Sequence, residues 1–441
     1  MTAPNVMNFL FTTWEGGGSV PPVLTVARKL IARGHRVRVM SDACNRPECE
    51  AVGAVFTPWT SAPSRASRSR DTDFLADWQA ETPQAGLMRA IDAVWAGPAL
   101  AYARDVMAEL EREAADLVVT SEMLFGVAAG CEAAHQPYAL LCVNVSLFPI
   151  PGIPPMGPGL APARSDGERA LHAEITQGGI ALFDHGLPAL NAARAKLGLA
   201  PLDHLIDQTR SAEACLLAIS RAFDFAPEEL PQGVRYVGPQ IGEPAWAEPW
   251  QSPWPTDDPR PLIAVGFSTT FQDHAAVLQR IADAVSGLPV RAVITLGEAI
   301  LPGEITAPKN VQVVGSCSHD ALMREAALVV THGGHGTVAR ALRHRRPLLV
   351  MPHGRDQNDN AVRVTERGAG LSLPPTATVA QIRGALGRLL SEPGFGRAAD
   401  RLGAQVANDV ETSPVVEDLE ALAAGARPGP GERPAKVFCP A

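Results

Sequence analysis

The stretch ALVVTHGGHGTVARAL, residues 327–342, changes character halfway along its length. It opens with apolar, β-prone residues, continues through Gly333, Gly334 and Gly336, and ends with apolar residues at helical spacing. This order predicts a buried strand, a glycine turn and a helix. Glycines let an anion approach the backbone, and the free N–H groups of a helix N-terminus attract negative charge. The stretch therefore predicts an α/β fold and a phosphate site, with a tight turn that binds nothing as the alternative.

Two polar side chains flank these glycines. His332 follows the predicted strand and can donate to a phosphate oxygen, and Thr337 can add a hydroxyl from the first helical turn. Ligands of open α/β sheets bind at the carboxyl ends of the strands, which is where both residues fall. Together they predict that a pyrophosphate is bound here without a metal ion.

A second polar stretch, PHGRDQNDNAVRV at 352–364, follows the next apolar run. Asp356 and Gln357 begin a predicted helix there, and Asn360 lies one turn on, on roughly the same face. A carboxylate and an amide suit the hydroxyl groups of a sugar. Simple N-capping by Asp356 is the alternative, and taken alone the two interpretations are about equally good.

A third stretch, GFSTTF at 266–271, ends another predicted strand. Ser268 and Thr269 would be placed to close over the same diphosphate. A capped turn before a helix beginning near residue 273 is the alternative.

The chain as a whole contains two successive β/α arrays. The first opens with an apolar run at 7–13, a glycine loop at 14–22, a helical pattern at 23–34 and a second strand at 35–40. Further strands are predicted at 116–120, 138–145 and 213–220, and in the second array at 261–267, 291–297, 311–315, 327–331 and 347–352. Strand, helix and strand in this order predict parallel sheets.

The segment 239–259 separates the two arrays and holds six prolines together with Trp246, Trp250 and Trp254. It is too rich in proline for a helix and too aromatic for a loose linker. We predict a first domain over 1–238, this interdomain linker over 239–259, a second domain over 260–425 and a disordered tail over 426–441. The three tryptophans are predicted to be packing anchors.

The composition of the chain limits the kinds of molecule it can bind. The chain has 441 residues, 46% of them hydrophobic, and a net charge of −9, which argues against a nucleic-acid surface or a polybasic membrane anchor. No run of 18 apolar residues and no signal-peptide pattern occurs, and the seven cysteines are dispersed. We expect a cytoplasmic protein with no integral membrane segment; the oligomeric state is unreadable.

The chain resembles the family 1 glycosyltransferases with the GT-B fold, in particular their bacterial natural-product branch. The resemblance rests on GGGSVPPVLTVARKLIARGHRV at 16–37, RYVGP at 235–239 and the long motif at 331–370, and it covers almost the whole chain. It implies two Rossmann-like βαβ domains facing across a cleft. The second domain would bind a nucleoside diphosphate sugar and the first a lipophilic small-molecule acceptor.

The resemblance also implies roles for the residues of the three stretches. His332, Gly334, Gly336 and Thr337 would hold the diphosphate, while Ser268 and Thr269 fall in a phosphate-facing loop. Asp356 and Gln357 would hold the sugar hydroxyls, with Asn360 beside them. The segment GSCSHDAL at 315–322 would flank the base, around Cys317 and His319. The donor, a UDP- or dTDP-sugar, is the substrate, and neither a further cofactor nor a metal is expected.

The chain departs from the family where many relatives carry a catalytic histidine in the first glycine loop. Gly18 and Ser19 stand at that place, and the aspartate that polarises the histidine would fall near Ser121. An unperturbed serine is no base at pH 7, so Glu15 or Glu122, next to the missing positions, could substitute. An acidic acceptor, such as a phenol or an activated carbon nucleophile, would need less help.

A second departure concerns the nucleotide. Arg340 replaces the ribose-binding glutamate of plant relatives, and Ser316 replaces their base-stacking tryptophan. The choice between UDP and dTDP is therefore open.

The acceptor wall is expected to be apolar and to come from the first half of the chain. We expect Trp14, Trp59, Trp78 and Phe125 to contribute to it, with Met88, Trp95 and Phe148 as further candidates; each of these is more often found in a core.

The reaction is expected to be a direct displacement that inverts the anomeric carbon. Four alternatives compete with this interpretation. A nucleotide-sugar epimerase would need several carboxylates facing the cleft, and no such set is found. The missing dyad keeps open a non-catalytic auxiliary protein that binds the nucleotide sugar, or a C-glycosyltransferase. A zinc site at His332, His335, His344 and His353 fits the glycine-loop context less well than a phosphate does.

Overall fold

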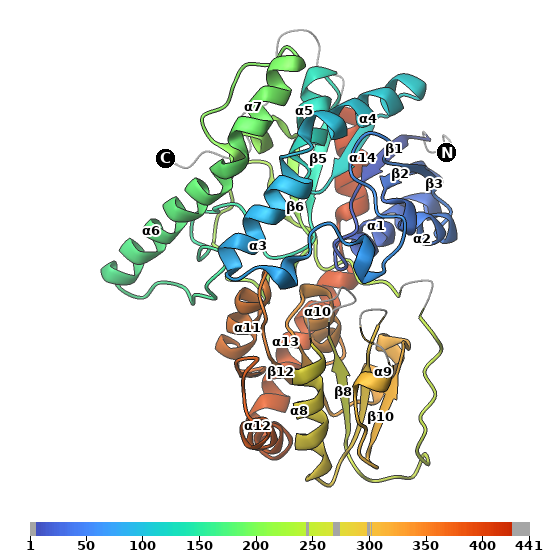
Figure 1. Ribbon diagram of the computed structural model, residues 1–441, viewed down its shortest axis with the longest axis vertical. Coiled ribbons are helices and arrows are strands. Elements are labelled where there is room, and N and C mark those ends of the chain that lie inside the picture. Colours follow the sequence, from blue (N-terminus) through green and yellow to red (C-terminus); the bar gives the residue numbers. More distant parts are fainter. Residues whose placement is uncertain (1–5, 244–246, 268–273, 298–299, 301, 426–441) are drawn as a thin grey trace.

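The computed structural model describes residues 6–243, 247–267, 274–297, 300 and 302–425, and two parallel sheets organise them. The first is a seven-stranded sheet of order β3-β2-β1-β4-β5-β6-β7 (Figure 1). Its strands are β1 (Asn8–Thr12), β2 (Arg36–Ser41), β3 (Val55–Pro58), β4 (Leu117–Thr120), β5 (Tyr138–Cys142), β6 (Ala214–Leu217) and β7 (Val234–Tyr236).

The second sheet, in the same described part of the chain, has six strands in the order β10-β9-β8-β11-β12-β13. They are β8 (Leu262–Gly266), β9 (Arg291–Thr295), β10 (Val311–Val314), β11 (Leu328–Thr331), β12 (Leu348–Val350) and β13 (Gly370–Ser372). Every strand pair in both sheets is parallel. The predicted α/β class with two Rossmann-like domains is confirmed.

Helices cover both faces of each sheet, which is why the strands are continuous apolar runs rather than alternating ones. Around the first sheet lie α1 (Val20–Ala32), α2 (Arg46–Ala51), α3 (Pro83–Ala90), α4 (Ala99–Arg112), α5 (Phe125–Ala133), α6 (Asp166–Phe183) and α7 (Leu187–Lys196). Around the second lie α8 (Ala275–Ser286), α9 (His319–Glu325), α10 (His335–Arg343), α11 (Gln357–Glu366), α12 (Val379–Ser391) and α13 (Pro393–Glu411). Among the described helices, none combines the length and the apolar character needed to cross a membrane.

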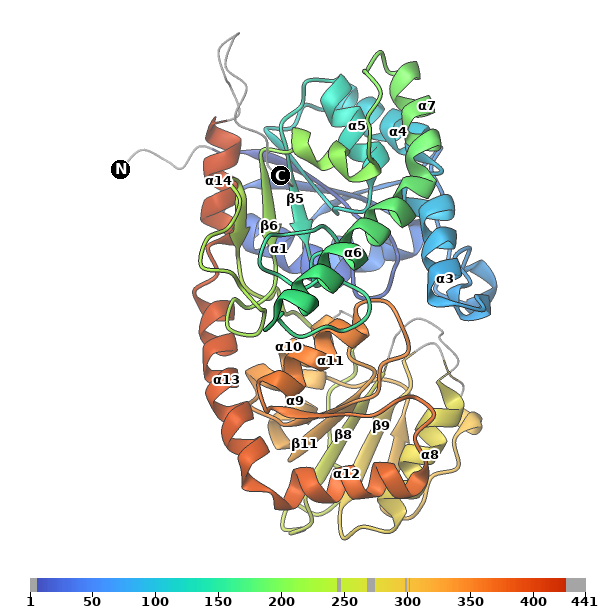
Figure 2. The same cartoon turned by 90° about the vertical axis from the view of Figure 1, so that its left-hand side faces the viewer.

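The last described helix, α14 (Val415–Gly425), belongs with the first sheet. Its Val415 and Leu419 share a buried cluster with Phe9 and Val26 of β1 and α1. Figure 2 shows α13 running along the lower domain and α14 continuing onto the upper one. From the sequence we assigned 415–425 to the second domain because these residues directly follow it along the chain. In the structure, the apolar face of α14 is buried against the first domain.

The described part of the linker is attached to both domains. The Gln240 amide oxygen accepts from Lys29 Nζ at 2.8 Å, which ties the linker to the first domain. Trp250 Nε1 donates to Glu325 at 3.0 Å, and Arg291 lies 5.8 Å above the Trp254 ring, both in the second. Trp250 and Trp254 therefore act as packing anchors, as predicted, and Trp246 lies outside the described residues.

Candidate functional site

The turn between β11 and α10 leaves a helix N-terminus open. Gly333 has φ +101°, a conformation that favours glycine, and the N-cap Gly334 provides no side chain to cap the helix. A side chain on Gly336 would meet nothing within 4 Å. The first N–H groups of α10 therefore have no side-chain cap, and the surroundings of Gly336 are open. Thr337 is half-buried in the same turn.

His332 lies directly over this turn. Its Nε2 would lie 2.6 Å from a Cβ placed on Gly334, so the imidazole covers the N-cap. Burial and the nearby charges of His353 and Arg355 lower the pKa of His332 to about 3. The ring is therefore neutral at physiological pH, and it reaches the helix N-terminus as a hydrogen-bonding group rather than a fixed charge.

The segment predicted to flank the base reaches the same edge of the sheet. Cys317 is buried, and His319 Nε2 lies 3.1 Å from Thr295 Oγ1 at the end of β9. A Cβ on Gly266, the last residue of β8, would lie 3.3 Å from the His319 ring. Because β8 and β11 are the neighbouring strands where the strand order reverses, this is the place where α/β sheets bind ligands.

The side chains of the acid–amide pair make hydrogen bonds within their own loop and helix. The Gln357 side-chain oxygen accepts from the backbone N–H groups of His353, at 2.7 Å, and of Gly354, at 3.2 Å. Asp356 occupies the N-cap position of α11 without a side-chain cap bond, and its carboxylate accepts from Asn360 Nδ2 at 2.9 Å. Burial raises the pKa of Asp356. The Gln357 oxygen thus shapes the loop, while half-buried Asp356 pairs with the buried Asn360, and a contact of these side chains with the sugar stays a prediction.

Two residues predicted to contact the donor lie outside the described part of the chain. Ser268 and Thr269 lie among residues that the structure does not describe, so their predicted contact with the diphosphate stays a prediction. Arg340, at the ribose position, donates to the carbonyl of Gly242 in the linker at 2.7 Å and lies 3.5 Å from Asp320. Its side chain is thus bound to the linker.

The candidate catalytic residues gather at the corresponding edge of the first sheet. Glu15 and Ser19 follow β1, Glu122 follows β4, and the ends of these two strands pair through Thr12 and Thr120. Ser19 is a buried N-cap of α1 whose side chain makes no cap bond. The strand order reverses between β1 and β4, so the two acids lie at the switch point of this sheet.

Glu15 is held by other groups. One carboxylate oxygen accepts from the Gly17 N–H at 2.9 Å and the other from Arg68 Nε at 3.1 Å. The guanidinium of Arg68 also pairs with Glu48 at 2.5 Å. Burial raises the pKa of Glu15, and Arg68 opposes that rise. Both oxygens are therefore engaged in keeping the loop in shape.

Glu122 is less constrained. Its Oε2 accepts from Ser121 Oγ at 3.3 Å, while its buried Oε1 has no hydrogen-bond partner among the described residues. Burial raises the pKa of Glu122 to about 7, and the charge of Asp356 in the other domain adds to the rise. A carboxylate that titrates near neutrality and keeps one free oxygen is suited to accept a proton.

The donor loop of the second domain touches the loop that carries Glu15. Arg355, at φ +56°, donates from Nη1 to the carbonyl of Gly16 at 3.4 Å and pairs with Asp77 at 2.7 Å. Asp359 of α11 accepts from the N–H groups of Gly157 and Gly159 in the first domain. These contacts hold the two switch points opposite each other.

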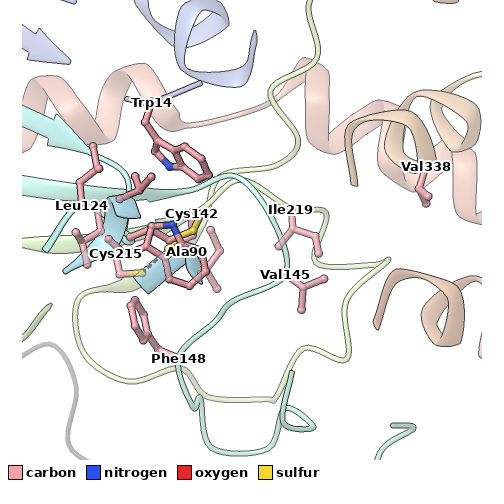
Figure 3. Packing of buried hydrophobic residues seen from close by; sticks show 14 of the residues in the cluster. Trp14, Ala90, Leu124, Cys142, Val145, Phe148, Cys215, Ile219 and Val338 are labelled. Atoms are coloured by element: carbon pink, nitrogen blue, oxygen red, sulfur yellow. Dashed lines mark hydrogen bonds between the residues drawn. The ribbon is translucent and has the colours of Figure 1, made fainter. Parts of the chain in front are cut away.

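Three of the aromatic residues predicted to line the acceptor site lie in the core of the first domain. Trp14 and Phe125 are buried in the cluster shown in Figure 3, where Trp14 and Phe148 lie on opposite sides of Cys142 and Ala90. Trp59 belongs to the same buried cluster, where its Nε1 donates to the Thr13 carbonyl at 3.1 Å and its ring meets Tyr102 edge-on.

The other candidates for the acceptor wall are Trp78, Trp95 and Met88. Trp78 is half-buried beneath Arg70, whose guanidinium carbon lies 5.4 Å from the ring centre. Trp95 stacks on Phe183 with ring centres 6.1 Å apart, and Met88 is half-buried. An acceptor role for any of these residues stays a prediction.

The four histidines of the zinc alternative do not converge. His344 pairs with Asp320 at 2.8 Å, and His335 faces Phe223 of the other domain with ring centres 6.0 Å apart. Across the described ranges, no group of three or more histidine, cysteine or acidic side chains is placed to hold a metal ion.

Sequence reasoning missed the residues that join the domains. Arg363 of α11 pairs with Asp224 at 2.8 Å, with both side chains buried. Asp224 also accepts from Tyr236 Oη at 2.7 Å. In the sequence, Arg363 falls on the apolar side of its helix, which only weakly indicates a buried charge. Nothing in the sequence indicates that it pairs with Asp224, 139 positions away.

Comparison with known proteins finds similarity to glycosyltransferases. Residues 279–422 match the family model described as Erythromycin biosynthesis protein CIII-like, C-terminal domain. The 4'-demethylrebeccamycin synthase of Lentzea aerocolonigenes is 28% identical over 426 residues, which cover 94% of this chain and 99% of that protein.

Solved structures agree on the fold. The calicheamicin glycosyltransferase superposes with a TM-score of 0.74 at 21% identity, over 96% of this chain and 100% of the other. A glycosyltransferase of Streptomyces sp. SF2575, in complex with thymidine diphosphate, superposes with a TM-score of 0.62 at 18% identity, over 94% and 99%. These likenesses confirm the GT-B architecture.

Proposed function

We propose that this chain, a member of the natural-product branch of the family 1 glycosyltransferases, moves a hexose or deoxyhexose from a UDP- or dTDP-sugar to a lipophilic small molecule. The proposed acceptors are phenols, polyketides and macrolides. One relative that is similar over 94% of this chain is named 4'-demethylrebeccamycin synthase, and one structural neighbour was solved with thymidine diphosphate.

The observation that carries the proposal is the open N-terminus of α10 beneath His332. Its first N–H groups have no side-chain cap, and Gly336 leaves room for a bulky group. Helix N-termini of this kind bind phosphates, because the N–H groups and the helix dipole both favour negative charge. The diphosphate of the donor would be bound here, which places the sugar toward the first domain.

The same groups would assist departure of the diphosphate. The glycosidic bond breaks through an oxocarbenium-like transition state, and negative charge grows on the leaving oxygen. Donors already oriented toward that oxygen stabilise the charge without reorganisation, which is the largest contribution in many enzymes. His332, Thr337 and the first turn of α10 are the described groups in this position. The donor is the substrate, and no further cofactor enters the proposal.

Glu122 is the residue we assign to the acceptor proton. It occupies the place next to the missing dyad, has a free buried oxygen, and lies at the switch point that faces the donor loop. Attack on the face opposite the diphosphate would invert the anomeric carbon. Glu15 then has a structural role, in the Arg68 ion pair, and no step is assigned to Ser19.

The test is a mass-spectrometric screen of UDP- and dTDP-sugars against phenols, aromatic polyketides and macrolides. We expect an acceptor mass increased by one glycosyl unit with at least one donor, and loss of that product in His332→Ala. Binding of donors in calorimetry without any transfer across the panel would contradict an enzyme and favour an auxiliary protein.

A further inference from the structure

Three histidines from separate elements surround Phe267 beside the donor site. The ring of His274 lies 4.4 Å from that of His353 and 5.8 Å from that of His332. The Phe267 ring contacts all three, with ring centres 5.1 to 5.8 Å away. His274 is the N-cap of α8, His332 follows β11, and His353 follows β12, so three loops at one sheet edge meet in this cluster.

His274 and His353 lie beside the donor site but are not among the groups assigned to the diphosphate. His274 is 1% exposed, and its Nε2 has no hydrogen-bond partner among the described residues. Its side chain does not cap α8, so α8 is a second helix whose N-terminus has no side-chain cap. A buried, unpaired ring nitrogen is costly, and such groups are typical of sites that are completed by a ligand.

Charge near the cluster is scarce for a site that is to hold a diphosphate. Arg355 is the nearest cation on the same loop, and it is paired with Asp77. Arg280 of α8 donates to the carbonyls of Pro375 and Ala377. Asp356, the nearby acid, accepts from Asn360. A nucleoside diphosphate sugar would bring two negative charges next to three uncharged imidazoles.

We propose that binding of the nucleoside diphosphate sugar is coupled to the uptake of one proton by this cluster, and that His353 carries the proton. The inference rests on the proposed function, because the diphosphate is the charge that drives the uptake. An adjacent anion favours the charged form of a histidine.

The geometry singles out His353 as the carrier. Its Nδ1 lies 2.8 Å from the carbonyl oxygen of Met351, so Nδ1 holds a hydrogen and Nε2 is the nitrogen open to protonation. The same carbonyl stabilises the imidazolium once it forms. His353 is half-buried, whereas His274 and His332 are buried.

The pKa shifts agree with a single proton. Burial, together with the charge of His353, lowers the pKa of His274 to about 2 and that of His332 to about 3. Burial lowers the pKa of His353 as well; its bond to Met351 opposes this, and the charge of Arg280 adds to the lowering. Once His353 is charged, the other two rings therefore stay neutral and act as hydrogen-bonding groups.

Proton uptake would supply positive charge only when the donor is present. In the empty site the cluster stays neutral, which avoids a buried, unpaired cation. In the complex, the imidazolium lies near the leaving diphosphate as its charge grows. Donor affinity should then increase as the pH is lowered from 8 toward 6.5, because the complex binds more protons than its separate components.

Isothermal titration calorimetry of the full chain measures this directly. UDP-glucose and dTDP-glucose are suitable probes, since their diphosphates do not titrate near neutrality. At pH 7, binding enthalpies in phosphate, HEPES and Tris should vary linearly with the ionisation enthalpy of the buffer. The slope should correspond to roughly 0.5–1 proton taken up per site.

Variants assign the proton to a residue. His353→Asn keeps an amide N–H for the Met351 carbonyl but cannot be charged, so it should lose the buffer dependence and bind the sugar nucleotide about tenfold more weakly. His135→Asn is the control, because His135 is exposed at φ +52°, a conformation that asparagine tolerates. It should retain both slope and affinity. Thermal melting and His353→Gln check that the loop remains folded.

The outcomes separate the two proposals. Binding by wild type with no buffer dependence overturns proton uptake but leaves the proposed function intact. A slope that persists in both His353 variants overturns the assignment to His353. If neither sugar nucleotide binds wild type, the proposed donor class is wrong and the coupled uptake is wrong with it.

Discussion

At the scale of single residues, His332 is the side chain on which donor binding should depend most. A hydrogen bond to a charged group contributes about 1.5–3 kcal/mol. His332→Ala should therefore weaken binding of dTDP or UDP by roughly ten- to a hundredfold in calorimetry, a loss in that energy range. Because the ring covers Gly334 and is otherwise packed on Phe267, the fold should survive. Unchanged donor affinity would remove His332 from the diphosphate site.

Glu122 should set the pH dependence of transfer. Its pKa is raised to about 7, and a base acts only when deprotonated, so kcat/KM should fall as the pH drops through about 7. Glu122→Gln should lower kcat about 100- to 10,000-fold, the range for loss of general-base help, and abolish this limb of the profile while donor affinity is unchanged.

Glu15→Gln is the matched comparison. It removes the charge that pairs with Arg68, so the melting temperature should fall while the acid limb of the pH profile is retained. If Glu15→Gln removed that limb and Glu122→Gln did not, the roles of the two acids would be reversed.

The sequence placed both acids beside the missing dyad but could not choose between them. The choice depends on Arg68, a residue 53 positions from Glu15 whose guanidinium reaches its carboxylate, and on Asp356, which lies in the other domain. Likewise, the sequence predicted that Gln357 binds sugar because an amide suits hydroxyls, and that contact stays a prediction. A sequence motif does not reveal that the Gln357 oxygen also accepts two backbone N–H groups of its own loop.

At the scale of elements, the first turn of α10 can be tested with two glycines. A Cβ at Gly334 would collide with the His332 ring at 2.6 Å, whereas one at Gly336 would meet nothing. Gly336→Ala should therefore leave the fold intact or stabilise the helix by about 0.5–1 kcal/mol. If a diphosphate lies over this turn, the added methyl should still weaken donor binding.

Thermal melting and calorimetry on the same samples check the prediction. Gly334→Ala should lose donor affinity through displacement of His332. A Gly336→Ala protein that is as stable as wild type and binds donor equally well would show that nothing approaches the turn closely.

The longer strands were predictable because each is an apolar run bounded by turn residues, as at β1 and β11. The short strands β3, β7 and β13 were missed, since Val55–Pro58 has little burial and Gly370–Ser372 begins with glycine. The sheet against which α14 packs could not be predicted from the sequence either. Its amphipathic pattern predicts a helix with a buried face but does not say which sheet that face covers.

At the scale of the whole molecule, the buried pair of Asp224 and Arg363 should hold the domains together. Removing one partner of a buried pair costs about 3–5 kcal/mol, because the other charge stays buried and unpaired. Asp224→Asn should therefore lower the midpoint of chemical denaturation clearly, and loosened domains should also reduce transfer.

A solvent-exposed pair is the control for this change. Arg388 and Glu392 lie one turn apart at the end of α12, with both side chains about half-exposed. Glu392→Gln should leave the denaturation midpoint unchanged. Equal midpoints for Asp224→Asn and wild type would show that the buried pair does not support the domain arrangement.

The most direct measurement is a crystal structure of the protein with dTDP or UDP bound. The account predicts the two phosphoryl groups at the amino end of α10, with phosphate oxygens about 3 Å from the N–H groups of its first turn and from the His332 ring. A nucleotide whose phosphates lie away from that turn, at either sheet, would contradict it.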